Sequence, residues 1–293
     1  MNFVILIPNP KKQIVMKLKY SLLTLFTIIL ILSCATNPFT GNKTLALVPN
    51  SQIFPTAFAQ YNQFLSENKV LKNTANAEMI TRVGQRIASA SELWLDANGY
   101  KGYLKDYKWE YNLVDDKAVN AWCMPGGKIV FYTGILPIAE NETAIAAIMG
   151  HEVAHALANH GQQRMSSGVL QQIGAVGVGV ATSGKSTEAQ EAWMTAYGVG
   201  STVGVMLPFS RSHESEADRI GLTLMAIAGY NPDEAAELWK RMNANSGGQA
   251  PPEILSTHPA NETRIANLTK LTPKAKQEAA KFGVTSFRPL GKY

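Results

Sequence analysis

The sequence predicts an α+β fold that is mostly helical and carries one small β-sheet. Helical periodicity occurs at 52–67 and at 77–96, and an Ala-rich stretch at 138–164 that contains no proline predicts a long buried helix. Three short stretches rich in β-branched and aromatic residues predict the strands, and the sheet is expected beside the 138–164 helix. The predicted strands are 107–114, 118–123 and 128–133.

The helix expected at 138–164 carries signals at both ends. Asn141 is a residue type that caps helix N-termini, and Glu142 follows it in the first turn, where the helix dipole favours a negative charge. Gly161 is expected to end the helix. Near the middle of this helix stands the run His151-Glu152-Val153-Ala154-His155.

The spacing of this motif predicts a metal site. Residues i and i+4 lie on the same face of a helix, so the imidazoles of His151 and His155 can reach one tetrahedral Zn²⁺ ion. Glu152 then lies beside the metal and is suited to remove a proton from a bound water. The motif therefore predicts one zinc ion per chain, with Glu152 as general base.

A third ligand is expected from the acidic segment 210–218. Glu214 and Asp218 are again an i, i+4 pair, so Glu214 can bind the metal while Asp218 accepts the spare N–H of a ligating histidine. This segment leads into an apolar stretch, and an unpaired carboxylate buried there would be costly. Glu216 and then His213 are the alternatives for the third ligand.

His258 is the histidine whose role is least defined by the sequence. Pro259 follows it and disfavours a helical conformation at this histidine. Three roles are open to His258: it stabilises a tetrahedral oxyanion, it occupies the open zinc position in a resting state, or it packs as a loop residue. His213 is a candidate for substrate contact, and His160 is expected to be a structural residue on the polar face of its helix.

Four blocks together resemble the zinc metalloendopeptidases related to the CAAX prenyl protease, and in particular the small bacterial lipoproteins of that family that handle misassembled envelope proteins. The resemblance covers about residues 75 to 270 and implies a zincin-type metallopeptidase domain with His151, His155 and Glu214 as zinc ligands, Glu152 as base and Asp218 as orienting residue. Prenylated substrates are not implied. The four blocks are Pro125-Gly126-Gly127, His151–His155, Glu214–Asp218 and Thr257-His258-Pro259.

A strand beside the motif helix is suited to bind an extended peptide. Such β-augmentation relies on main-chain hydrogen bonds and depends little on substrate side chains. By the layout of the family, Asn120 and Ala121 are expected near that edge as substrate-binding residues, and Gly126-Gly127 is expected to form the turn between the last two strands.

The N-terminal segment predicts a cleaved secretory signal. Lys17 and Lys19 precede an apolar run at 22–32, and Cys34 follows a small residue, which is typical of a lipidated cysteine. A spanning signal anchor is the alternative, although the run is short for one. We expect residues 1–33 to be the signal, with residues 1–15 arising from an upstream start of translation. The processed protein is expected to be an outer-membrane lipoprotein that faces the periplasm.

Charge excludes a nucleic-acid partner. Residues 1–33 contain four of the 27 Lys and Arg and none of the 22 Asp and Glu, so the processed chain has a net charge of 23 − 22 = +1. The expected organisation is a lipidated tether at 34–50, a catalytic domain at 51–275 and a tail at 276–293. The segment 168–207, rich in Gly, Ala and Val, is expected to be a packed hairpin, a flap over the site or a membrane-contacting hairpin.

These observations predict a membrane-tethered zinc endopeptidase that hydrolyses misfolded or misassembled envelope proteins. A chaperone-like or scaffolding lipoprotein with an autoinhibited protease site is the first alternative. A zinc hydrolase of cell-wall stem peptides is the second, although no wall-binding module is recognisable.

Overall fold

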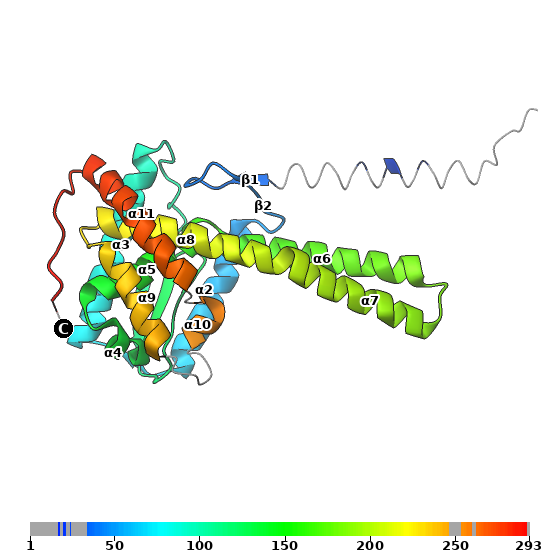
Figure 1. The fold of residues 1–293 in the computed structure, drawn as a ribbon, viewed down its shortest axis with the longest axis horizontal. Coiled ribbons are helices and arrows are strands. Elements are labelled where there is room, and N and C mark those ends of the chain that lie inside the picture. Colours follow the sequence, from blue (N-terminus) through cyan, green and yellow to red (C-terminus); the bar gives the residue numbers. More distant parts are fainter. Residues whose placement is uncertain are drawn as a thin grey trace, which may run out of the picture.

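The computed structural model describes residues 34–245, 253–259 and 262–291, together with residues 17, 20, 21 and 24. Most of the expected signal, 1–33, therefore lies outside the described residues. The fold is mostly helical with two small sheets, which confirms the predicted class (Figure 1). The helices are α2 (Asn50–Glu67), α3 (Ala75–Ala97), α4 (Leu136–Ala139), α5 (Glu142–Leu157), α6 (His160–Thr182), α7 (Thr187–Ser201), α8 (Leu207–Ile227), α9 (Asp233–Asn245), α10 (Glu253–Thr257) and α11 (Glu262–Lys281), with a 3-10 turn η1 (Thr133–Ile135) and a π-helix η2 (Thr202–Met206).

The larger sheet has four strands in the order β3-β4-β6-β5. β4 runs parallel to β6, and β5 runs antiparallel to β6 as the edge strand that packs against α5. Gly126 and Gly127 connect β5 to β6 with φ values of 84° and 87°, so the predicted glycine turn is confirmed. The strands are β1 (Cys34–Thr36), β2 (Lys43–Leu45), β3 (Val70–Leu71), β4 (Glu110–Val114), β5 (Ala121–Met124) and β6 (Lys128–Tyr132).

Helix α5 is the centre of the core. Every residue from Thr143 to Leu157 is buried, and the helix packs against α3, α8, α9 and β5. The predicted cap is present, because the Asn141 side-chain oxygen accepts a hydrogen bond of 2.8 Å from the backbone N–H of Ala144. The alanines that made this segment a strong helix former also give it the small diameter that close packing on several sides requires.

α5 and α8 cross with their backbones in contact. A Cβ atom on Gly150 would lie 2.8 Å from the carbonyl oxygen of Gly221, and a Cβ on Gly221 would lie 2.8 Å from the backbone nitrogen of His151. Real Cβ atoms do not approach backbone atoms so closely. The two glycines therefore allow the motif helix and the acidic helix to touch.

The expected continuous helix over 138–164 is wrong, because the chain breaks between α5 and α6. Asn159 adopts a left-handed conformation with φ 55°, which asparagine tolerates better than most residues. Its side chain donates to the Tyr103 hydroxyl at 2.7 Å and accepts from the Asn50 amide at 3.0 Å. Gly161 does not end the helix but lies in the first turn of α6.

Helices α6 and α7 form an antiparallel hairpin that projects from the body (Figure 1). The Tyr197 hydroxyl donates to the carbonyl of Gln171 at 2.8 Å, and Gly174 makes room for the Tyr197 side chain. Of these three glycines, only Gly174 is required by a close contact, because Cβ atoms on Gly177 and Gly198 would meet nothing within 4 Å. None of the helices in the described part of the chain is long and apolar enough to cross a membrane.

The segment expected as a tether has structure of its own. β1 and β2 form a two-stranded antiparallel sheet, and the residues that follow pack on α6. The backbone N–H of Leu47 donates to the Ser166 hydroxyl at 3.0 Å, and the Gln162 amide donates to the carbonyl of Val48 at 2.9 Å. Cys34, the expected lipidation site, is exposed at the start of β1.

The glycine contact between α5 and α8 predicts a specific stability effect. Gly150→Ala is expected to lower the free energy of unfolding of the metal-free protein by about 1–3 kcal/mol, because the added methyl forces the helices apart. Gly177→Ala is the matched control, because it makes the same change in the exposed face of α6, and it should leave stability unchanged or raise it by up to about 1 kcal/mol. Urea denaturation measures both, and equal losses would rule out a special role for the crossing.

Candidate metal centre

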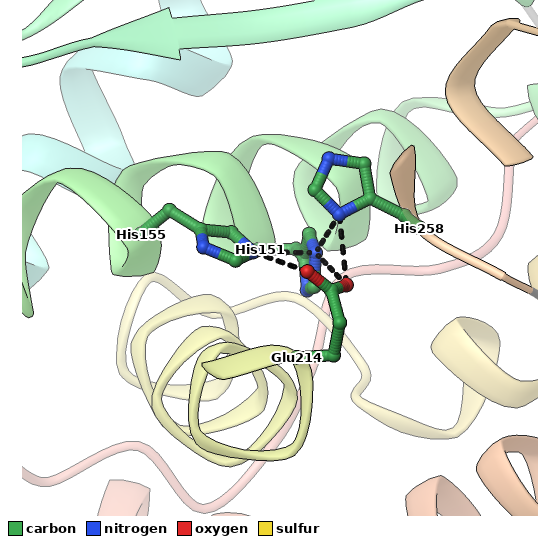
Figure 2. Close-up of side chains that lie close together, drawn as sticks. All are labelled: His151, His155, Glu214 and His258. Atoms are coloured by element: carbon green, nitrogen blue, oxygen red, sulfur yellow. Dashed lines mark hydrogen bonds and ion pairs between the residues drawn. The ribbon is translucent and has the colours of Figure 1, made fainter. Parts of the chain in front are cut away.

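Four side chains from three parts of the chain converge beneath the edge strand. His151 and His155 come from α5, Glu214 comes from α8, and His258 follows α10 (Figure 2). One ligand atom from each lies within 4.8 Å of all the others. The two motif histidines are buried, whereas Glu214 and His258 are partly exposed.

The distances among the side chains of His151, His155 and Glu214 fit a tetrahedral zinc ion. His151 Nε2 lies 3.1 Å from His155 Nε2 and 3.3 Å from Glu214 Oε2, and His155 Nε2 lies 3.3 Å from Glu214 Oε1. Ligand bonds of about 2.0–2.1 Å around a tetrahedral ion give edges of about 3.3 Å. Two imidazoles and a carboxylate are also the usual donor set of catalytic zinc.

His258 stands at the fourth corner of the same group. Its Nδ1 atom lies 3.1 Å from His151 Nε2 and 2.8 Å from Glu214 Oε2. Its Nε2 atom lies 3.5 Å from Glu152 Oε1. Of the three roles open to this histidine, this position corresponds to occupation of the open metal position in a resting state.

Asp218 and Arg264 hold His151 in place. Asp218 Oδ1 lies 2.9 Å from His151 Nδ1, and Arg264 donates to both carboxylate oxygens at 2.7 and 2.9 Å. Burial raises the pKa of Asp218, but Arg264 and His151 outweigh it and lower that pKa to about 2. An ionised Asp218 accepts the Nδ1 proton of His151, which leaves the Nε2 lone pair free for a metal.

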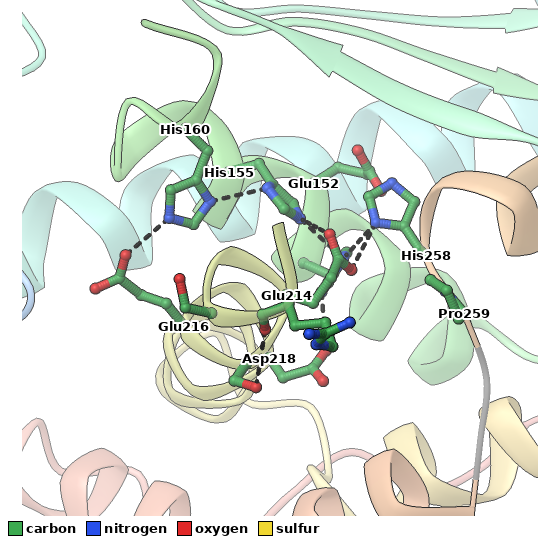
Figure 3. Close-up of polar contacts among 12 residues, drawn as sticks. Glu152, His155, His160, Glu214, Glu216, Asp218, His258 and Pro259 are labelled. Atoms are coloured by element: carbon green, nitrogen blue, oxygen red, sulfur yellow. Dashed lines mark hydrogen bonds and ion pairs between the residues drawn. The ribbon is translucent and has the colours of Figure 1, made fainter. Parts of the chain in front are cut away.

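His155 is held by a longer chain of contacts that the sequence analysis missed (Figure 3). Its Nδ1 atom lies 2.9 Å from His160 Nδ1, and His160 Nε2 lies 2.8 Å from Glu216 Oε2. If Glu216 accepts the proton of His160 Nε2, then His160 Nδ1 can accept from His155, whose Nε2 is again free. The expectation that His160 lies on a polar face is therefore wrong, because this residue is fully buried behind the metal group.

Electrostatics favours the metal-binding protonation states of His155 and Glu214. At His151, burial and Arg264 lower the pKa, but hydrogen bonds to Asp218 and Glu214 outweigh them and raise it to about 9, so zinc must displace a proton there. Burial lowers the pKa of His155 well below its usual value, and the neighbouring His151 and His160 lower it further, so this imidazole is neutral. Burial raises the pKa of Glu214, but hydrogen bonds to the surrounding histidines outweigh it and hold that pKa far below the usual range. Neutral imidazole and ionised carboxylate are the forms that bind zinc.

Glu152 is buried beside the group without being part of it (Figure 3). Its Oε1 atom has no hydrogen-bond partner among the described residues. A buried carboxylate oxygen in this state is costly unless something polar reaches it, such as a water held at the centre. The orphaned oxygen and the tetrahedral spacing both indicate that the residues present fit a zinc ion and its water.

The remaining predicted residues lie outside the four-residue group. Asn120 and Ala121 lie at the start of the edge strand β5, where the Asn120 side-chain oxygen accepts from the N–H of Ala121 at 2.9 Å. His213 is buried, lies 3.1 Å from the Gln163 amide oxygen, and stacks on His160 with ring centroids 4.0 Å apart. Arg264 could not be found from local spacing, because it follows Asp218 by 46 residues.

Comparison with known proteins agrees with this geometry. The mitochondrial metalloendopeptidase OMA1 of Saccharomyces cerevisiae is 35% identical over 181 residues, which cover 59% of this chain and 50% of the relative. The beta-barrel assembly-enhancing protease of Escherichia coli is 30% identical over 190 residues, 62% of this chain and 39% of the relative. The human mitochondrial OMA1 is 26% identical over 261 residues, 86% and 48% of the two chains.

The chain thus spans half or less of the length of these curated relatives. The model of peptidase family M48 matches residues 75–272, a range that includes all four residues of the metal group and Glu152. The chain therefore belongs to peptidase family M48, a family of metalloproteases that use zinc.

Proposed function

We propose that this protein is a zinc metalloendopeptidase in which His151, His155 and Glu214 hold one zinc ion. The observation that carries this proposal is the convergence of three ligand side chains from two helices, at distances that suit zinc, in a chain of the M48 family. When bound, zinc lowers the pKa of its water to about 7 and polarises the substrate carbonyl.

The chain's own residues supply the proton transfers and the orientation. Glu152, with its free Oε1 atom, takes a proton from the attacking water and delivers it to the leaving amine. Asp218 orients His151, and Glu216 orients His155 through His160. Because both ligating imidazoles are held by contacts that end in carboxylates, little reorganisation is needed during turnover.

The substrate is proposed to be an unfolded or misassembled protein bound in extended form along β5. β5 is one of the two edge strands of its sheet and packs on the motif helix, so a peptide that pairs with its free side would lie close to the helix that carries His151 and His155. Main-chain pairing with β5, beginning near Asn120 and Ala121, accepts many sequences. This breadth suits a quality-control protease, a role in keeping with the name of the Escherichia coli relative.

The proposed location is the bacterial cell envelope, with Cys34 lipidated and the domain facing the periplasm from the outer membrane. The support is the basic and apolar leader before Cys34 and the exposure of that cysteine at the start of β1. The small-bacterial-lipoprotein branch of the family is proposed on the same basis. No nucleic-acid partner is proposed.

Two observations favour the alternative of a chaperone-like or scaffolding lipoprotein with an autoinhibited site. His258 stands at the fourth corner of the metal group. The backbone N–H of Ile254 donates to the carbonyl of Val119 at 3.2 Å, so α10 lies against the chain just before β5. The described conformation is therefore closed, and peptide entry requires α10 and His258 to move.

The third ligand can be tested by metal content. In a His258→Ala background, Glu214→Ala is expected to lose the single zinc ion of the wild-type protein, because the two remaining imidazoles do not complete the site. Glu216→Gln should keep one zinc but bind it about 10–100-fold more weakly, because it acts through His160. His213→Gln removes the other alternative ligand and should leave both quantities unchanged, because His213 lies outside the four-residue group. Mass spectrometry and competition with a chelator measure them, and full zinc in the doubly substituted protein would exclude Glu214 as a ligand.

The general base can be tested with an unfolded substrate. Glu152→Gln is expected to retain zinc but to cleave casein at least about 100-fold more slowly, because the amide cannot take up the water proton. Removal of zinc from the wild-type protein by 1,10-phenanthroline should abolish the same cleavage, and added zinc should restore it. Wild-type rates in zinc-loaded Glu152→Gln would refute the mechanism.

The role of His258 can be tested by the direction of one rate change. His258→Ala is expected to raise the rate of casein cleavage on the order of 10-fold. This gain follows if roughly nine wild-type molecules in ten are closed, because only the open fraction cleaves. An oxyanion-stabilising role instead requires a fall of about 100-fold or more. Leu93→Ala, a change at an exposed position of α3, is the control. Unchanged cleavage in His258→Ala would leave His258 with only the packing role.

A further inference from the structure

The surface of the α6–α7 hairpin differs from the rest of the molecule. Eleven of the fourteen exposed large hydrophobic side chains of the described residues lie between 165 and 207, and α7 has no buried residue. Outside this segment only one lies on a helix of the body, Leu93 on α3. The eleven are Met165, Val169, Ile173, Val176, Val180, Trp193, Met194, Val199, Val203, Val205 and Leu207.

The hairpin also lacks the charges that normally cover a solvent-exposed helix pair. Residues 165–184 and 192–210 contain no Asp, Glu, Lys or Arg, and the charged residues are confined to the tip (Lys185, Glu188, Glu191) and the base (Arg164, Arg211). Twenty residues of helix extend about 30 Å. An uncharged apolar surface of this length on a projecting element marks an interaction site.

The exposed apolar side chains are not confined to one side of α7. At about 100° per residue, Met194 and Val199 lie roughly 100° and 240° around the helix from Trp193. Tyr197 and Ser201 face α6, through contacts to Gln171. Apolar side chains therefore occupy both flanks of the contact with α6 and the side opposite to it. A docked protein typically covers one face, whereas lipid surrounds an inserted element.

The base of the hairpin lies next to the point where the chain meets its apolar leader. Leu47 and Val48, a few residues beyond β2, hydrogen-bond to Ser166 and Gln162 of α6. Figure 1 shows β1 and β2 over this base. The apolar run at 22–32 ends just before Cys34, so either a lipid on Cys34 or an uncleaved leader would hold a bilayer close to the hairpin.

We propose that the α6–α7 hairpin docks on the lipid bilayer, with its apolar side chains at the boundary of the acyl chains and its charged tip in water. This proposal rests on the membrane location proposed above. The hairpin connects the metal-binding helices directly, since α6 follows α5 and α7 continues through η2 into α8. Docking would thus fix the orientation of the metal group relative to the membrane surface.

Fluorescence quenching by brominated lipids tests this contact in the full chain. The chain is reconstituted into vesicles of phosphatidylethanolamine and phosphatidylglycerol with bromine on the acyl chains. Trp193→Phe is expected to remove more than half of the tryptophan quenching, because Trp193 lies on the hairpin. Trp94→Phe is the control, since Trp94 stacks on Phe39 in the body, and it should remove little. Equal effects of the two substitutions would overturn the proposal.

Substitution of apolar hairpin residues by charged ones provides a second test of the contact with lipid. Val176→Asp with Val180→Asp is expected to reduce the quenching of Trp193 by more than half, whereas Leu93→Asp, an exposed apolar position of the body, should not change it. Unchanged thermal unfolding and casein cleavage establish that the variants are folded. Loss of a wild-type dimer in the hairpin variant, measured by light scattering, with unchanged quenching would identify a second copy as the occupant and overturn the proposal.

Vesicle flotation distinguishes a failure of the hairpin-docking proposal from a failure of the proposed membrane location. A full chain that floats with vesicles but shows no quenching specific to Trp193 retains its membrane location and refutes hairpin docking alone. A full chain that does not float refutes both the proposed location and the docking. Casein cleavage by the wild type, measured in parallel, reports on the protease proposal independently of either result.

Discussion

The contact between α5 and α8 at Gly150 and Gly221 is the constraint on which the metal group depends. His151 directly follows Gly150, and Asp218 and Glu214 precede Gly221 by about one and two helical turns. The backbone distance at the crossing therefore sets how far each carboxylate lies from the imidazoles. The edges of about 3.3 Å that zinc requires follow from two helices packed at backbone contact, which larger side chains at these positions would prevent.

The second feature of the site is the way in which the two nitrogens of each motif histidine are directed. Each motif histidine has one nitrogen directed at the metal position and the other directed at a chain that ends in a carboxylate, Asp218 directly or Glu216 through His160. Arg264 balances the charge of Asp218 and stacks on Trp239 with its guanidinium carbon 3.7 Å from the ring centroid. These contacts orient both imidazoles without the metal, so that each presents its Nε2 atom to the metal position.

The sequence predicted what local spacing determines. The i, i+4 pairs, the Asn141 cap and the Gly126-Gly127 turn depend on neighbouring residues, and the structure contains each of them. The break at Asn159 was missed because its left-handed conformation is supported by Tyr103 and Asn50, which are remote in sequence. The partnership of His160 with Glu216 was missed for the same reason: it forms only once the α5–α6 break turns His160 back toward α8.

His258 connects the fourth corner of the metal group to the general base. Its Nδ1 atom lies 3.1 Å from His151 Nε2, and its Nε2 atom lies 3.5 Å from Glu152 Oε1. Departure of His258 would therefore vacate the fourth corner and uncover Glu152 in one step. A ligand shifts such an equilibrium only by the difference between its affinities for the two forms, so a peptide that pairs with β5 only in the open form would supply the energy for opening.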